Sequence, residues 1–465
     1  DTDRSRGLGD VYKRQLSNNE KTGENIMKKR YIFGSAALAL LATITLAACG
    51  SKTSSSGTGK NIKATITFVD QKTDMHSNGM WKKYIAQFNK EYPNITVKEQ
   101  ALNNYDQTEQ TRMSSKNFGD VIAIPAAVAP KDYPNFFSSL GKTKDLEKKY
   151  TSLQDRTYKG EQYGLPSEVN ANGFVVNWNV FKKAGIDKWP TTTDEFIQDL
   201  KTIKTKEPDV TPLYTNYACG WALVDWDFQR SSVAGDPNFD LALAKTDKPF
   251  TAGQPMYTIY NTLYTAAKDG LINHDPTTDD WNTSVSQMAQ NKVGVMMLAT
   301  WAVPQVQAQM SSNKDAINVE PFPQKAPDGK TYMLVGGDYN WGVNKNSKNQ
   351  EAAKDWVNWL VDKSDFAKDN GGMTAMKNQP YPADLNDAKK NKVVFFEAGS
   401  TPADKADLFS NINNGSQVGI GTTQTVKQQI IDSGDGSSNK SFASIMDGLN
   451  TCLLYTSDAA DDGES

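Results

Sequence analysis

The residues of this chain that could perform chemistry are few, and their spacing excludes several reaction classes. The sequence holds two histidines, His76 and His274, and neither stands in a His-Glu-x-x-His or Cys/His metal-binding spacing. It contains neither a Gly-x-Ser-x-Gly motif of a serine hydrolase nor a Gly-x-x-x-x-Gly-Lys-Ser/Thr phosphate-binding loop. We therefore expect no metal site and no cofactor.

Two pairs of neighbouring aspartates could supply the two carboxylates of a glycosidase, namely Asp225 with Asp227 and Asp279 with Asp280. Neighbouring acidic residues are frequent in a chain with 54 aspartates and glutamates, so solvation at the surface is the better explanation. A secreted glycosidase stays as an alternative. The segment Asp225-Trp226-Asp227 also keeps a polyamine ligand open, because an acidic aromatic box suits a cationic amine.

The elements that must position such residues begin with a strand and a helix. Residues 62–69 alternate apolar and mixed side chains, a pattern that predicts a strand. After a loop over 70–78, Trp81, Tyr84, Ile85 and Phe88 fall on one helical face, which ends at Tyr92-Pro93.

Further strands and helices alternate along the chain. Strands are predicted at 95–99, at 121–124 as a buried parallel strand, and at 292–297. Thr192 and Glu195 have capping-box spacing and predict the start of a helix, and 351–360 predicts another. This alternation indicates layered α/β structure.

The two ends of the chain differ in character from the body between them. Val11–Gln15 can be encoded by a DNA stretch whose reverse complement, shifted by one base, encodes Cys452–Thr456. One inverted DNA element at both ends explains this, so we expect residues 1–26 to be cloning or assembly sequence with upstream residues, and 451–465 to be a foreign tail. The natural sequence then starts at Met27 and lacks its native C-terminus.

Residues 27–48 have the composition of a secretory signal peptide, with a basic start and a short apolar run. The run ends in Leu-Ala-Ala-Cys49, which resembles the bacterial lipoprotein signal and implies acylation of Cys49. An ordinary signal peptide with an incidental cysteine is the alternative. Residues 49–60 are almost all Ser, Thr, Gly and Lys, which predicts a flexible tether.

The remaining body has about 400 residues, a length that suits two domains of ordinary size. The net charge of −3 suggests no nucleic-acid partner. Of the three cysteines, only Cys219 lies in the body, so no disulfide framework is expected and Cys219 is predicted to be a small core residue.

An ordered series of short motifs runs through this body. Its members are Gly164-Leu165-Pro166, Val176-Asn177, Phe181–Ile186, Trp189–Thr192 with Glu195, Val293–Met296, Trp301, Pro321–Pro323, Gly336–Asp338 and Ser347–Ala353. In order and spacing, the series resembles the family 1 extracellular solute-binding proteins, the family that includes the maltose-binding protein. The resemblance covers nearly all of residues 62–450.

The resemblance implies an α/β, periplasmic-binding-protein-like fold, with two discontinuous α/β lobes joined by a hinge with three crossings. The expected N-terminal lobe comprises 61–170 and 337–374, and the C-terminal lobe 171–336 and 375–450. The crossings are expected near Val169–Asn172, Gly336–Asn340 and Gly372–Lys377. A ligand would lie in the cleft and stabilise the closed state by contacting both lobes.

The family also implies a function, which is the capture of a sugar or oligosaccharide for an ABC importer rather than an enzymatic reaction. The expected partners are a permease with its ATPase and the bacterial cell membrane, to which Cys49 would anchor an extracytoplasmic monomer. The same fold could instead carry a polyamine or a peptide.

Sugars offer faces of C–H groups and many hydroxyls, so their sites need aromatic rings and side-chain amides or carboxylates. Trp301 falls where the family places a ring-stacking tryptophan, and Trp221 lies in an aromatic-rich stretch that corresponds to a cleft loop. Core packing is the alternative for both. Asp74 follows the first strand, where the family uses polar side chains, with helix capping as the alternative.

The crossings supply the other expected ligand-binding residues. Glu168 and Asn170 lie at the first crossing, with a turn role as the alternative for Asn170, and Asp338 and Tyr339 lie at the second. The glycines before Asp338 would let the backbone approach a ligand closely. Residues 412–421 lack the late cleft tryptophan of the maltose-binding protein, so maltodextrin specificity does not carry over.

Overall fold

The computed structural model describes residues 59–399, 402, 405 and 407–461. The predicted leading residues 1–26, the signal peptide 27–48 and Cys49 lie outside this part of the chain. None of the helices in the described part combines the length and the apolar character that crossing a bilayer requires.

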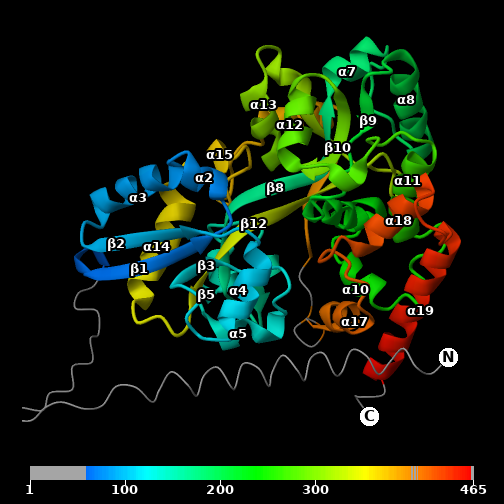
Figure 1. Ribbon diagram of the computed structural model, residues 1–465. Coiled ribbons are helices and arrows are strands. Elements are labelled where there is room, and N and C mark those ends of the chain that lie inside the picture. The colour runs from blue at the N-terminus through cyan, green and yellow to red at the C-terminus, as the bar shows by residue number, and fades with distance from the viewer. Residues whose placement is uncertain (1–58, 400–401, 403–404, 406, 462–465) are drawn as a thin grey trace, which may run out of the picture. The chain divides into compact units, whose positions relative to one another are not determined.

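Most described strands belong to one mixed sheet. They are β1 (Ala64–Asp70), β2 (Ile95–Ala101), β3 (Val121–Ala123), β4 (Phe137–Ser138), β8 (Gly164–Asn177), β9 (Thr211–Leu213), β10 (Val293–Ala299), β11 (Ile317–Glu320), β12 (Tyr332–Asn344) and β13 (Val394–Glu397). The main path has the order β2-β1-β3-β12-β8-β10-β9, so the long antiparallel strands β8 and β12 run through its middle (Figure 1). Three short strands, β5 (Gly141–Lys142), β6 (Thr157–Tyr158) and β7 (Glu161–Gln162), form a second sheet.

Helices surround these strands. They are α2 (Thr73–Ser77), α3 (Met80–Glu91), α4 (Tyr105–Met113), α5 (Tyr133–Phe136), α6 (Thr143–Leu146), α7 (Trp178–Lys183), α8 (Thr193–Lys206), α9 (Arg230–Ala234), α10 (Phe239–Leu243), α11 (Pro255–Lys268), α12 (Trp281–Ala289), α13 (Val303–Gln309), α14 (Gln350–Lys363), α15 (Phe366–Asp369), α16 (Asn386–Lys390), α17 (Leu408–Ser416), α18 (Thr425–Asp435) and α19 (Phe442–Asp461). The last of these helices runs past the predicted boundary at residue 450.

The predicted periodic segments are confirmed as elements of the expected type. α3 buries Trp81, Tyr84 and Phe88, as its spacing predicts. The predicted loop over 70–78 differs, because it contains the short helix α2.

The capping residue of α8 is confirmed in atomic detail. The Thr192 hydroxyl accepts the Glu195 backbone N–H at 3.2 Å and satisfies a donor that the helix itself leaves unpaired. The Glu195 carboxylate reaches the backbone N–H of Thr191 at 2.8 Å, one residue before the position that a reciprocal capping box uses.

β8 is buried on both faces because it separates two hydrophobic clusters. Phe174 and Val176 belong to one cluster, together with residues of α8 and α11, whereas Val175 belongs to the other. The cluster that contains Val175 is built on aromatic rings around Phe68 of β1. The ring centroid of Phe68 lies 4.8 Å from that of Trp341. Successive side chains of a strand point to opposite faces of the sheet, and β8 carries apolar residues on both faces because each face is covered by one of the two clusters.

The three segments expected to cross between lobes lie side by side. Gly337 of β12 pairs with Val169 of β8, and Val169 also forms an isolated bridge with Met373. The lobe boundaries themselves stay a prediction.

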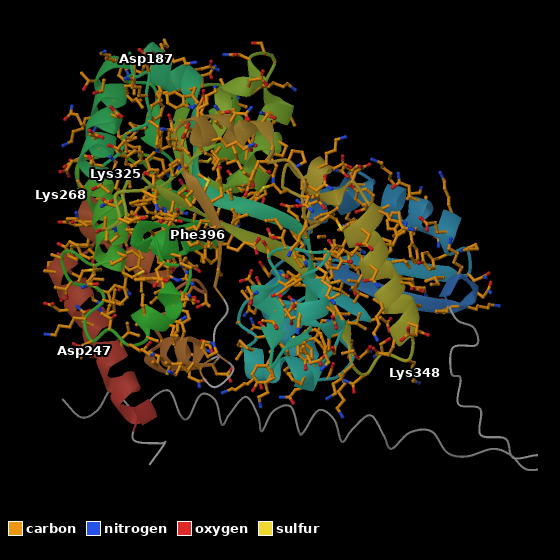
Figure 2. The ribbon with its side chains drawn as sticks, turned by 180° about the vertical axis from the view of Figure 1, so that it is seen from behind. Asp187, Asp247, Lys268, Lys325, Lys348 and Phe396 are labelled. Atoms are coloured by element: carbon orange, nitrogen blue, oxygen red, sulfur yellow. The ribbon has the colours of Figure 1, made fainter. Side chains whose placement is uncertain are left out.

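Several charged residues lie at the surface near the ends of helices. Asp187, Asp247 and Lys268, at or just beyond the ends of α7, α10 and α11, are exposed and point outward (Figure 2).

Candidate functional site

A cavity of about 540 Å³ is the centre of the candidate site. Its wall includes residues of β8, β12, α9, α10 and α17, and of the 3-10 helices η4 (Trp221–Gln229) and η6 (Thr300–Ala302). Gln71, just beyond the carboxyl end of β1, also lines it, as expected for ligand sites in open α/β sheets. The volume lies within the range of roughly 300–1,000 Å³ that is usual for small-molecule sites.

Asn170 of β8 connects three elements at the wall of the cavity. Its amide N–H groups donate to Glu168 Oε1 at 2.8 Å and to Asp338 Oδ2 at 3.2 Å. Its carbonyl oxygen accepts the Thr300 hydroxyl at 2.8 Å. β8, β12 and η6 are therefore tied together by one side chain.

Two carboxyl groups flank this amide in a poorly hydrated environment. Burial and the nearby charge of Asp338 raise the pKa of Glu168 well above its ordinary value. Burial also raises the pKa of Asp338, although the Tyr339 backbone N–H, which donates to Asp338 Oδ1 at 2.6 Å, opposes the shift. Both carboxyl groups therefore favour their protonated forms more than a solvated carboxyl group does.

The backbone of β12 is unusual where it lines the cavity. Tyr339 has a φ of +45°, which is uncommon for a residue with a side chain and costs about 1–3 kcal/mol. Its ring packs against those of Trp341 and Phe366, at centroid distances of 6.1 and 5.4 Å. A Cβ on Gly336 would meet no atom within 4 Å, so this glycine leaves open space in the wall.

Three tryptophan rings form a cluster at the cavity. Trp301 lines the cavity, and its ring centroid lies 5.4 Å from that of Trp281 and 5.6 Å from that of Trp221. The Trp281 indole N–H donates to Gln305 at 3.1 Å, which fixes this ring. Trp221 is 47% exposed, an unusual environment for so large an apolar group.

The structure brings together only part of the ligand-binding set predicted from the sequence. Asn170, Trp301, Asp338 and Tyr339 line the cavity. The other three lie outside its wall. Glu168 is fully buried and accepts the Asn170 amide, and Trp221 is the exposed member of the tryptophan cluster, with its ring tilted by 50° against that of Trp301.

Asp74 lies in the first turn of α2, and the structure does not bring it to the cavity. Its side chain is 58% exposed and lies 3.3 Å from the ammonium group of Lys72. The chain turns into α2 directly after Gln71, which directs Asp74 to solvent. A ligand-binding role for each of these residues stays a prediction.

Surface solvation is the wrong interpretation for three of the four paired aspartates. Asp225, Asp227 and Asp279 are at most 9% exposed. Asp279 accepts the backbone N–H groups of Tyr217 and Ala218, at 2.7 and 2.8 Å.

Asp280 caps α12 by accepting the Thr283 backbone N–H at 3.0 Å. Both members of the second aspartate pair therefore have a structural role, which is to accept hydrogen bonds from backbone N–H groups.

The acidic aromatic box suggested by Asp225-Trp226-Asp227 does not form. Trp226 is 1% exposed and packs its ring against the edge of Phe174 in the core. Asp227 is fully buried and its charge is balanced by Lys427, at 2.5 Å. Neither group can surround a cationic amine, so the sequence feature that favoured a polyamine is lost.

Cys219 lies at the edge of the core rather than within it. The residue is partly buried, and burial raises the pKa of its thiol to about 11. Over the described ranges, no group of three or more His, Cys, Asp and Glu residues is arranged to hold a metal ion.

Sequence reasoning missed several polar residues of the wall, among them Gln71, Arg156 and Asn172. The position of Gln71 after the first strand was a usable signal, because ligands bind at the carboxyl ends of strands. Arg156 had no such signal. It lies in the 3-10 helix η3 (Gln154–Arg156), and its guanidinium donates to the backbone oxygens of Asp155 and Ile124.

Comparisons with known proteins point to one family. Residues 73–365 match the family model described as bacterial extracellular solute-binding protein. The multiple sugar-binding protein of Streptococcus mutans is 26% identical over 333 residues, which covers 69% of this chain and 76% of that protein. The melibiose/raffinose/stachyose-binding protein of Bacillus subtilis is 24% identical, covering 69% and 75%.

Solved structures agree with this assignment. An ABC-transporter binding protein of Bifidobacterium animalis subsp. lactis in complex with mannobiose is 35% identical, with a TM-score of 0.81, covering 86% of this chain and 96% of its own. A manno-oligosaccharide-specific solute-binding protein of the same organism, in complex with mannotriose, has the same values.

These matches confirm the predicted periplasmic-binding-protein-like α/β fold. They also confirm that the chain is a binding protein and not an enzyme. The chain belongs to the bacterial extracellular solute-binding proteins.

Proposed function

We propose that this protein captures a sugar or oligosaccharide in the cavity beside β8 and β12, and delivers it to the permease of an ABC importer. The strongest support is the 35% identity to proteins that hold mannobiose and mannotriose. A manno-oligosaccharide is accordingly the first ligand to test.

The wall of the cavity has the residue types that a saccharide needs. Trp301 offers an aromatic face for the C–H side of a sugar ring. The Asp338 carboxylate accepts bonds from Asn170 and from the Tyr339 N–H, and a carboxylate has about four acceptor positions, so two positions are left for sugar hydroxyls. Asn170 has both amide N–H groups engaged and is better suited to hold Asp338 in place.

Anchoring at the membrane forms the second part of the proposal. The Leu-Ala-Ala-Cys49 ending of the signal peptide supports acylation of Cys49, and the Ser/Thr/Gly-rich residues 50–60 would act as a tether. Such an anchor would keep the protein on the extracytoplasmic side of the cell membrane, close to its permease.

A calorimetric titration of the purified protein tests the proposed ligand class. The panel comprises mannobiose, mannotriose, raffinose and, as a different class, spermidine and a tripeptide. A sugar that binds only the folded state stabilises it by about 2.7 kcal/mol at 100 times its Kd, so thermal unfolding provides a second readout. Binding of spermidine or of the tripeptide alone would overturn the proposed cargo.

A further inference from the structure

Asp225 is a buried carboxyl group at the cavity wall to which none of the described residues donates a hydrogen bond. It lies in η4, lines the cavity and is 8% exposed. Its Oδ2 is buried without a hydrogen-bond partner, and no hydrogen bond from a described residue to either carboxyl oxygen is present. A buried polar group in this condition is rare in native proteins and calls for a physical explanation.

The neighbouring carboxyl groups show how unusual this is. Asp227 accepts hydrogen bonds from Tyr260 at 2.8 Å, from the Gly421 N–H at 2.8 Å and from Lys427 at 2.5 Å. Asp338 and Glu168 each accept the amide of Asn170, and Asp338 also accepts a backbone N–H. Asp225 alone among these four acids has no donor in the described part of the chain.

Electrostatics makes this position of Asp225 more unfavourable still. Burial, with the charges of Asp338 and Asp227 added to it, raises the pKa of Asp225 well above its ordinary value. No cation of the described chain pairs with it, since Lys427 is taken up by Asp227. At the wall of a cavity, an unfavourable group of this kind can serve binding at the expense of stability.

The cavity indicates what kind of ligand could supply the missing donors. Arg156 and Arg230 line the same cavity; Arg230 is ion-paired with Asp240, whereas the Arg156 Nε is buried with no acceptor among the described residues. A hydroxyl group can donate to a carboxyl group such as that of Asp225 and can also accept from a guanidinium such as that of Arg156, whereas an ammonium group can only donate. The combination fits an uncharged polyhydroxyl ligand.

We propose that Asp225 is a ligand-binding residue, whose carboxyl group is satisfied only when hydroxyl groups of a bound neutral saccharide donate to it. The proposal rests on the proposed function and adds a specificity determinant to it. A saccharide without a donor at that position would leave Asp225 buried and unpaired, and binding would be correspondingly weaker.

The test compares Asp225→Asn and Asp225→Ala with a matched control, Glu320→Gln. Glu320 is also a fully buried acid with unpartnered oxygens, but it does not line the cavity. Each variant is titrated with the panel sugar that binds the wild type most tightly, and its ligand-free melting temperature is measured.

We expect both Asp225 variants to lose affinity by about 10- to 100-fold, as for the loss of a hydrogen bond to a charged group. The ligand-free melting temperature of Asp225→Asn should be equal to that of the wild type or higher, because asparagine removes a group whose ionised form is desolvated and unpaired. Glu320→Gln should bind within twofold of the wild type. A purely structural role for Asp225 would instead lower the melting temperature.

The outcomes separate the two levels of inference. If the wild type binds a sugar and both Asp225 variants bind it within twofold, the role of Asp225 is refuted and the proposed function stands. If the wild type binds no sugar of the panel, the proposed function fails, and the role of Asp225 fails with it.

Discussion

Replacing Glu320 by glutamine should stabilise this protein, and more so at higher pH. Glu320 ends β11 and is fully buried, and within the described part of the chain neither of its carboxylate oxygens has a hydrogen-bond partner. Burial, together with the charge of Asp387, raises its pKa from 4.5 to about 8. The amide of glutamine has nearly the same shape and carries no charge at any pH.

The pKa shift sets the magnitude and the sign of the effect. Because the folded pKa lies above the unfolded one, the stability contributed by protonated Glu320 is fully present below about pH 4.5 and is lost as the pH rises through about 8. Relative to a pH at which Glu320 is protonated in both the folded and the unfolded state, this shift lowers the free energy of unfolding by about 1 kcal/mol at pH 5, about 3 kcal/mol at pH 7 and about 4 kcal/mol at pH 8. Glu320→Gln should recover amounts of this order.

Urea denaturation of the wild type and the variant at pH 5, 7 and 8 measures this difference. The exposed Glu351 provides the control, because Glu351→Gln should change the free energy of unfolding by less than about 0.5 kcal/mol at each pH. A Glu320→Gln effect that stays constant from pH 5 to pH 8 would show that Glu320 is not a desolvated acid in solution.

Three further predictions address the core, the ligand and the membrane anchor. Lys427→Met should lower the free energy of unfolding by about 3–5 kcal/mol in urea, since it leaves Asp227 charged and buried; a loss below about 1 kcal/mol would contradict this, and adding Asp227→Asn should restore much of the stability. Trp301→Ala should weaken sugar binding by about tenfold or more in calorimetry, in line with the loss of an aromatic stacking partner, while shifting the ligand-free melting temperature little; a large drop in that temperature would assign Trp301 to the core. Cys49→Ala should move the protein from the membrane fraction to the soluble fraction of cells, and retention in the membrane would exclude the lipid anchor.

Local patterns predicted the elements well because their causes are local. The spacing of Trp81, Tyr84 and Phe88 predicted the buried face of α3, and Thr192 predicted the start of α8. In both cases the sequence signal lies within one turn or on one face of the same helix. Such signals can be read without knowledge of the partner surface.

The site was only partly predictable because a cavity collects residues from distant segments. Asn170, Asp338 and Trp301 were found through a family resemblance that placed them at crossings and strand ends. Arg156 was missed because nothing near it in the sequence indicates that η3 faces a cavity.

Asp225 and Asp227 show most clearly the difference between what the sequence determines and what the tertiary structure determines. The sequence by itself determined that two carboxyl groups lie two positions apart in an aromatic segment. Only the tertiary structure decided their roles, because a 3-10 helix has three residues per turn and directs these two side chains to different sides. Asp227 meets Lys427, which comes from a helix 200 residues further along the chain, whereas Asp225 faces the cavity and accepts no hydrogen bond from the residues that the structure describes.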